Sequence, residues 1–283
     1  MREYPITPSG WTVTTHRSVG PFRTNVTWRR PDGHVFEWSS RTHRKHASRL
    51  SRTSPEDQGI WWAPHRASWW IGVLFAIGAT CFMIGPLPGF VEWVGSAVDG
   101  AVFFVGSVFF TSAAGLQCLE TFNADREPGG GGRQAFRVLV FEPRRIDWWS
   151  SVVQFIGTLL FNVMTFRAMQ TGLEDPSYNR LVWAPDLIGS ICFLVSGYLA
   201  YVEICGRYVC WRQRSLEWKI AAVNFLGCIA FGISAIAAYV VPSTGSALDL
   251  AAANSFTALG GVCFLVGALL LLPESAAQAR LPA

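Results

Sequence analysis

The feature that most limits how this chain can fold is a series of long apolar segments that begins after residue 66. Segments of about 20 apolar residues are long enough to cross the hydrocarbon core of a bilayer as α-helices. Only 15% of the residues are charged, whereas the share in average soluble domains is about 25%. We therefore expect an all-α integral membrane protein with helices at about 69–84, 101–119, 148–167, 182–202, 218–241 and 250–272.

Short patterns recur at fixed spacing in these segments. In the second, fourth and sixth, an aromatic residue lies four residues after a glycine, and a glutamate lies fourteen after it. These sets are Gly106, Phe110 and Glu120; Gly189, Phe193 and Glu203; and Gly260, Phe264 and Glu274. The other three segments share a tryptophan, a glycine and a phenylalanine, with one extra residue before the third glycine. These sets are Trp70, Gly78 and Phe82; Trp149, Gly157 and Phe161; and Trp218, Gly227 and Phe231. The agreement predicts three tandem copies of a two-helix membrane hairpin.

Lysine and arginine are concentrated on one side of the predicted membrane. With six spans, the N-terminal region, the loops at 120–147 and 205–219 and the tail share one side and carry 21 of the 23 basic residues. The other two are Arg167 and Arg180. The positive-inside rule places both termini in the cytoplasm and the protein in the cell membrane. The three hairpins then have the same orientation, as parallel repeats do.

We divide the chain into a basic cytoplasmic unit at 1–65, membrane hairpins at 66–120, 148–204 and 205–274, a cytoplasmic loop at 121–147 and a tail at 275–283. The first unit contains a predicted β-hairpin, because Pro31-Asp32-Gly33 is typical of a turn. Its strands set Val26 opposite Trp38 and Trp28 opposite Phe36 on one apolar face. A lone hairpin is marginal in water, so we expect this face to pack on another segment, and the strand-like run at 136–141 is a candidate.

The stretch 41–52 is strongly basic. It is either a solvated face or a contact for anionic lipid headgroups, and we expect no binding of nucleic acid. His43 and His46 could share a helix face, but no third ligand lies nearby, so no metal site is expected. The glycine run at 129–132 lacks the Lys-Ser/Thr of a phosphate-binding loop and is interpreted as a linker.

The most regular ionisable residues are Glu120, Glu203 and Glu274, near the predicted cytoplasmic helix ends. They could form an acidic ring at a cytoplasmic mouth. They could instead tie each helix end to an arginine or a tryptophan N–H of its own hairpin. At the opposite edge, Arg167 and Asp186 are a candidate ion pair, since both lie about 25 Å from the cytoplasmic ends of their helices.

The predicted membrane interior has polar but no charged side chains. Gln154, Asn162 and Asn224 are its main polar residues, and such residues join helices by hydrogen bonds. We therefore expect neither a haem held by two intramembrane histidines nor a proton relay of buried acids, and no protease pattern is present. We expect no catalytic residue, no metal ligand and no cofactor. The seven cysteines are interpreted as reduced, with no disulfide.

The tryptophan-led helix followed by Gly-Ser-x-x-Phe and a terminal glutamate resembles the YrhK-like family of bacterial membrane proteins. The resemblance is carried by 69–82 with 106–120 and by 148–161 with 189–203, and 154–162 is similar to longer actinobacterial proteins of this type. The third copy departs from the pattern, with Gly261 in place of serine. The resemblance implies membrane packing and assigns no catalytic or binding residue.

Three classes of function remain open. A non-enzymatic scaffold or sensor comes first, with a protein partner or a second copy of the chain as possible binding partners beside the lipid bilayer. A channel or transporter for a small solute comes second, and an enzyme third. A polar cavity containing Asn162 and Asn224 would favour transport. A dry core packed by Phe82, Phe161 and Phe231 would favour the scaffold.

Overall fold

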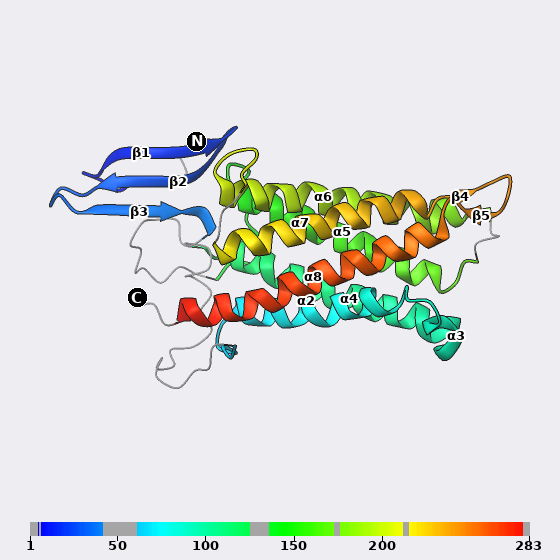
Figure 1. The fold of residues 1–283 in the computed structure, drawn as a ribbon. Coiled ribbons are helices and arrows are strands. Elements are labelled where there is room, and N and C mark those ends of the chain that lie inside the picture. Colours follow the sequence, from blue (N-terminus) through cyan, green and yellow to red (C-terminus); the bar gives the residue numbers. More distant parts are fainter. Residues whose placement is uncertain are drawn as a thin grey trace.

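The computed structural model describes residues 5, 7–41, 61–124, 136–172, 176–211 and 215–279. A three-stranded sheet lies beyond one end of a bundle of long helices, and the last helix ends there too (Figure 1). We call this end the sheet end and the opposite one the far end. The far end carries a short helix, α3 (Phe90–Val94), and a hairpin of β4 (Val240–Val241) and β5 (Ser246–Ala247).

Six helices in the described parts of the chain are long and apolar enough to cross a membrane, which confirms the six predicted segments. They are α2 (Ala67–Ile84), α4 (Ser96–Phe122), α5 (Ile146–Ala168), α6 (Ala184–Cys205), α7 (Leu216–Ala237) and α8 (Leu250–Ala279). A π-helical turn, η2 (Asn179–Trp183), leads into α6. Each of the six packs against the next along the chain, and α8 packs against α2. The helices therefore form a closed ring around a central axis.

Two predicted helix ends are wrong. Pro273 lies inside α8 and does not stop it. Beyond the proline, Glu274, Ser275 and Ala276 are buried, and Ala276 packs against Trp69, so tertiary contacts favour the extra helical turn. Helix α7 ends at Ala237 rather than near 241, because the chain turns there into the β4–β5 hairpin.

The predicted β-hairpin is confirmed, with β2 (Phe22–Arg29) and β3 (Val35–Ser39) as its strands. Val26 pairs with Trp38 and Trp28 with Phe36, as expected. Gly33 takes the left-handed conformation, with φ of 87°, that this turn requires. The third strand, β1 (Thr12–Val19), pairs with β2, and Trp11 covers the apolar face of the hairpin.

The prediction that residues 136–141 pack on this face is wrong. The run forms no strand, and Phe136, Val138, Leu139 and Phe141 are exposed. Its contacts are instead with α5, where the Trp148 indole donates to the Val140 carbonyl. Strand β1 joins the hairpin instead. It is nearer to β2 in the sequence than residues 136–141 are, so its pairing costs less loop-closure entropy. The linker at 129–132, the run 42–52 and the last residues of the tail lie outside the described residues.

Successive helices approach each other closely at pairs of glycines. A Cβ placed on Gly78 of α2 would lie 2.8 Å from the carbonyl oxygen of Gly106 on α4. The corresponding distances are 3.1 Å between α5 and α6 and 3.3 Å between α7 and α8. The glycines of these two crossings are Gly157 with Gly189 and Gly227 with Gly260. Glycine is needed at such crossings because it lets two backbones meet.

The cysteine prediction is wrong for one pair. Cys205 and Cys210 form a disulfide at the sheet end, with 5.7 Å between their Cα atoms. Gly206 adopts a φ of 61° directly after α6, and this reversal brings the two cysteines into bonding range. The remaining five cysteines are free, among them the four predicted inside membrane spans.

Candidate functional site

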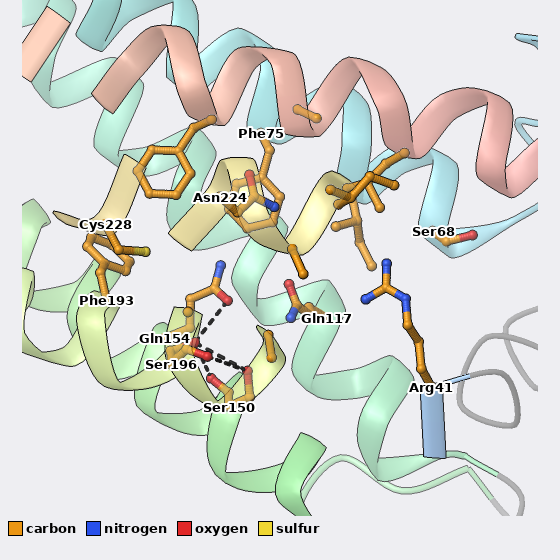
Figure 2. A pocket seen from close by; sticks show the side chains of 18 of the residues that line it. Arg41, Ser68, Phe75, Gln117, Ser150, Gln154, Phe193, Ser196, Asn224 and Cys228 are labelled. Atoms are coloured by element: carbon orange, nitrogen blue, oxygen red, sulfur yellow. Dashed lines mark hydrogen bonds between the residues drawn. The ribbon is translucent and has the colours of Figure 1, made fainter. Parts of the chain in front are cut away.

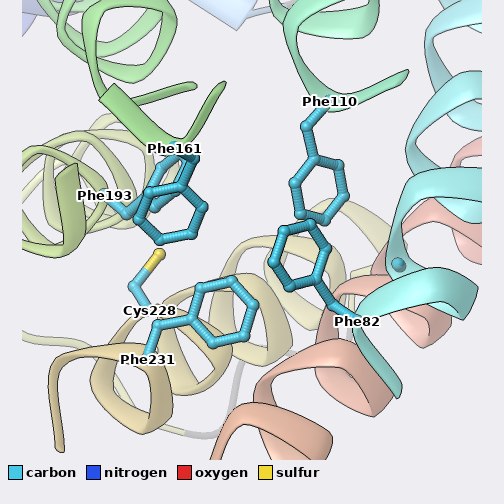
Figure 3. Close-up of a cluster of buried hydrophobic side chains, with 7 residues drawn as sticks. Phe82, Phe110, Phe161, Phe193, Cys228 and Phe231 are labelled. Carbon is cyan, nitrogen blue, oxygen red and sulfur yellow. The ribbon is translucent and has the colours of Figure 1, made fainter. Parts of the chain in front are cut away.

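Each of the six spanning helices contributes a phenylalanine to the middle of the bundle, five of which are labelled in Figure 3. They are Phe82, Phe110, Phe161, Phe193, Phe231 and Phe264. Phe82, Phe161 and Phe231 form a triangle whose ring centroids are 5.7 to 6.0 Å apart. The other three pack against this triangle. Phe82, Phe161 and Phe231 therefore pack together as a core, which is the arrangement that the sequence analysis associated with a scaffold.

A polar cavity of about 110 Å³ lies between the phenylalanines and the sheet end, and we call it the sheet-side cavity. All six spanning helices line it, and Phe193 and Phe264 form part of its wall nearest the bundle centre. Figure 2 shows Arg41 and Ser68 toward one end of this cavity and Phe193 and Cys228 toward the other. The polar side chains of its wall, which stand among apolar ones, are Arg41, Ser68, Gln117, Glu120, Ser150, Gln154, Ser196 and Asn224. The cavity has the size and polarity to hold several water molecules.

Of the three predicted polar residues of the interior, two line this cavity and one does not. Gln154 accepts a hydrogen bond of 3.3 Å from Ser196, and Asn224 packs against Gly267 of α8. Asn162 instead donates to Thr111 on α4 at 2.8 Å, as an interhelical tie. The sheet-side cavity therefore does not contain both asparagines, which was the arrangement that would have favoured transport.

The three predicted glutamates are all buried at the sheet end. The Ser40 hydroxyl donates to Glu203 at 2.6 Å, and Arg41 donates to Glu274 at 3.1 Å. Both partners directly follow strand β3, so the N-terminal segment fills the mouth of the bundle. Two of the three carboxylates are therefore engaged by the segment that follows β3. Glu120 lines the sheet-side cavity, and its Oε1 is buried without a hydrogen bond.

The contact of Arg41 was missed from the sequence, because the run 41–52 was interpreted as either a solvated face or a contact for anionic lipid headgroups. The Arg41 side chain is 9% exposed and lies against a glutamate that is 5% exposed. Burial lowers the pKa of Arg41, but the carboxylates of Glu274, Glu203 and Glu217 raise it, and the net pKa lies above the ordinary value. The guanidinium is therefore held in its charged form. The sequence signal for this contact was the repeated glutamates, because a carboxylate that becomes buried needs a cation.

A second cavity, of about 220 Å³, lies on the other side of the phenylalanine triangle, and we call it the far-side cavity. All six helices again contribute to it, and Phe82, Phe161 and Phe231 form its wall toward the bundle centre. Three more aromatic residues line it, namely Phe103, Tyr178 and Trp183. The Trp183 indole is held by a 2.9 Å hydrogen bond to the Ala235 carbonyl.

The predicted ion pair between Arg167 and Asp186 is wrong. No salt bridge joins them in the part of the chain that the structure describes. Asp186 lines the far-side cavity, whereas Arg167 is exposed. The reason is helical phase, since Phe161, Met164, Thr165 and Ala168 are the residues of α5 that line the cavity, and residue 167 lies off this face.

Within the described ranges, no group of three or more His, Cys, Asp or Glu side chains could hold a metal ion. Comparisons with protein families, curated proteins and solved structures found no match to this chain. The functional interpretation therefore rests on the two cavities, the phenylalanines between them and the Arg41 contact at the mouth.

Proposed function

We propose that the protein is a membrane pathway for a small solute, in a state closed at two points. The observation that carries the proposal is the placement of two partly polar cavities on one axis, separated by the triangle of Phe82, Phe161 and Phe231. An apolar constriction between wet spaces is a known way to gate a pore, because it excludes water until it widens. Arg41 at the sheet-end mouth is the second closure.

The pathway is built from three tandem copies of one hairpin in this proposal. Matched contacts support it, beginning with the three glycine crossings. The indoles of Trp69 and Trp148 each donate to the carbonyl eight residues earlier, and those of Trp70 and Trp149 to the carbonyl six residues earlier. Three parallel copies around an axis give a pathway with threefold pseudosymmetry. The resemblance to YrhK-like bacterial proteins covers the same hairpins.

In the cell membrane we place the sheet end and both termini in the cytoplasm, although the Cys205–Cys210 disulfide at that end is of a kind more common in oxidising compartments. The support is the distribution of basic residues, because the far end has only Arg167 and Arg180. The sheet-side cavity then faces the cytoplasm and the far-side cavity the outside. Anionic lipid headgroups are natural neighbours of the basic N-terminal unit in this orientation.

A non-enzymatic scaffold or sensor is the alternative, and one observation favours it. The phenylalanine core is packed as densely as a structural core, with centroid separations down to 4.8 Å between Phe161 and Phe193. In that case the protein would act by holding a protein partner or a second copy of the chain outside the bundle. The alternative predicts that the core never opens.

Solute flux separates the two functions. The assay is urea entry into proteoliposomes, measured by light scattering after osmotic shock, for the wild type and Phe231→Ala. The matched control is Phe166→Ala, because Phe166 is 44% exposed and lines neither cavity. A pathway predicts faster urea entry for the Phe231 variant alone, and a further rise when Arg41→Met is added.

Truncating Phe231 removes packing worth about 3–5 kcal/mol, so retention of the fold is checked by size-exclusion chromatography. Phe161→Ala opens the same triangle and serves as a second variant if the first does not fold. Folded variants of both residues with wild-type urea entry would refute the pathway and favour the scaffold.

A further inference from the structure

The far-side cavity holds one carboxylate with no compensating charge. Asp186 lines it, and the other lining residues include no lysine, arginine or histidine. Asp186 also makes no hydrogen bond or ion pair with the residues that the structure describes. Tyr178 lines the same cavity, where burial and then the negative charge of Asp186 raise the pKa of its phenol. An acid in a membrane-spanning helix with no cation on the same cavity wall is costly and by default indicates a functional site.

Aromatic rings share the wall of this cavity with the carboxylate. Six rings line the cavity, from Phe82, Phe103, Phe161, Tyr178, Trp183 and Phe231. The face of an aromatic ring is electron-rich and attracts cations, and cages of such rings are the usual protein site for alkylated ammonium groups. A cavity that combines one carboxylate with several rings therefore selects a cation that also has apolar surface.

The hydroxyl groups in the cavity argue against a small inorganic cation. Hard cations need a shell of oxygen ligands. Three of the four side-chain hydroxyl groups on the cavity wall already make hydrogen bonds between or within helices. Ser234 donates to the Ala253 carbonyl and shares a hydrogen bond with Thr257. Thr165 donates to the Phe161 carbonyl. Beside Asp186, the Tyr178 hydroxyl and the Asn254 amide are the side-chain oxygens of the wall that make no such bond within the described residues, and together they are fewer than the roughly six to eight oxygens of a hard-cation shell.

We propose that the far-side cavity binds a small organic cation, a substituted ammonium ion, with Asp186 as its counter-ion and the aromatic rings as its cage. The cavity volume of about 220 Å³ is smaller than a pocket for a drug-sized molecule, so the cation is small. The sheet-side cavity is a poor site for the same ion because Arg41 lines it. As a statement about the transported solute, the proposal rests on the pathway function, but the site can be tested without flux.

The test is calorimetric binding of choline to the purified protein in detergent. The neutral comparison ligand is 3,3-dimethyl-1-butanol, which has the shape of choline but no charge. Asp186→Asn removes the charge of the site and keeps its shape. Asp249→Asn is the control, because Asp249 lies at the same end outside the cavity and caps α8 through the Ala252 N–H, a bond that asparagine can also accept.

We expect choline to bind and its neutral analogue not to, with a loss of affinity of about tenfold or more in Asp186→Asn and none in Asp249→Asn. Equal binding of the two ligands, or full affinity in a folded Asp186→Asn protein, would overturn the proposal. Choline binding without urea entry through the Phe231 variant would support the cation site and refute the pathway. Urea entry without choline binding would support the pathway and refute the cation site.

Discussion

Arg41→Met is the substitution that most directly tests how the sheet end is held. It removes the cation that contacts Glu274 and raises no steric problem, since methionine fills similar space. Glu274 would stay buried and lose the Arg41 guanidinium, which also lies within the electrostatic reach of Glu203. Because breaking a buried ion pair by removing one member is strongly destabilising, we expect a loss of about 3–5 kcal/mol in the free energy of unfolding.

The exposure of the pair sets this magnitude. The Arg41 and Glu274 side chains are 9% and 5% exposed, whereas those of Arg30 and Asp32, which lie 4.0 Å apart, are 49% and 51% exposed. A solvent-exposed pair of the second kind contributes only about 0–1 kcal/mol. Asp32→Asn is therefore the matched control, since asparagine can still accept the hydrogen bond that Asp32 receives from the His34 N–H at 3.1 Å.

The assay is equilibrium unfolding in mixed micelles with increasing dodecyl sulfate, followed by circular dichroism. The double variant Arg41→Met with Glu274→Gln removes both charges and should recover most of the lost stability. The Arg41 pKa is raised, so its contribution is complete below the unfolded-state pKa and is lost only above the folded-state pKa. The difference between wild type and variant should therefore stay constant from neutral pH to about pH 10.

A loss below about 1 kcal/mol in Arg41→Met, no larger than that in Asp32→Asn, would refute the reasoning. It would mean that water or another cation compensates the glutamates at the mouth. A double variant as unstable as the single one would refute it differently, because the cost would then come from lost packing of the arginine stem rather than from the carboxylate left behind.

Three further predictions concern the helix crossings, the cysteines and the sheet. Gly78→Ala should lower stability by about 1–3 kcal/mol in the same unfolding assay, because the new Cβ meets backbone, while Gly115→Ala, whose Cβ would have ordinary contacts, should not. Alkylation of the denatured, unreduced protein should label five cysteines, with Cys205 and Cys210 labelled only after reduction, as mass spectrometry can show. Trp11→Ala should speed tryptic cleavage of the N-terminal sheet, because it uncovers the apolar face of the hairpin.

The parts of the fold that follow from local pattern could be predicted. Apolar length gave the six spanning helices, and the alternation around Gly33 gave the register of β2 with β3. Strand β1 could not be found in this way. Its sequence, Thr12–Val19, is exposed at all but one position, so it has no alternation of buried and exposed residues to reveal it.

The candidate site was predictable where helical phase decides it. Gln154 and Asn224 each lie three residues before the glycine of a helix crossing, and both face the sheet-side cavity. Asn162 follows its glycine by five residues and faces α4 instead. The contact of Arg41 with Glu274 spans 233 positions of the sequence, and no local pattern indicates which distant carboxylate a cation will meet.

The two cavities differ in charge, and this difference bears on how a closed bundle of this kind could open. At the sheet end, Ser40 and Arg41 belong to one segment, so its withdrawal would free Glu203 and Glu274 together and favour entry of water and cations. Neither Ser40 nor Arg41 is among the described residues that pack with the phenylalanine triangle, so the triangle would remain shut. The far-side cavity, with Asp186 and no cation on its wall, would still hold a positive solute against the closed triangle. Carboxylates on both sides of an apolar constriction thus give a cation a favourable site at each end of the same path, which an anion would lack.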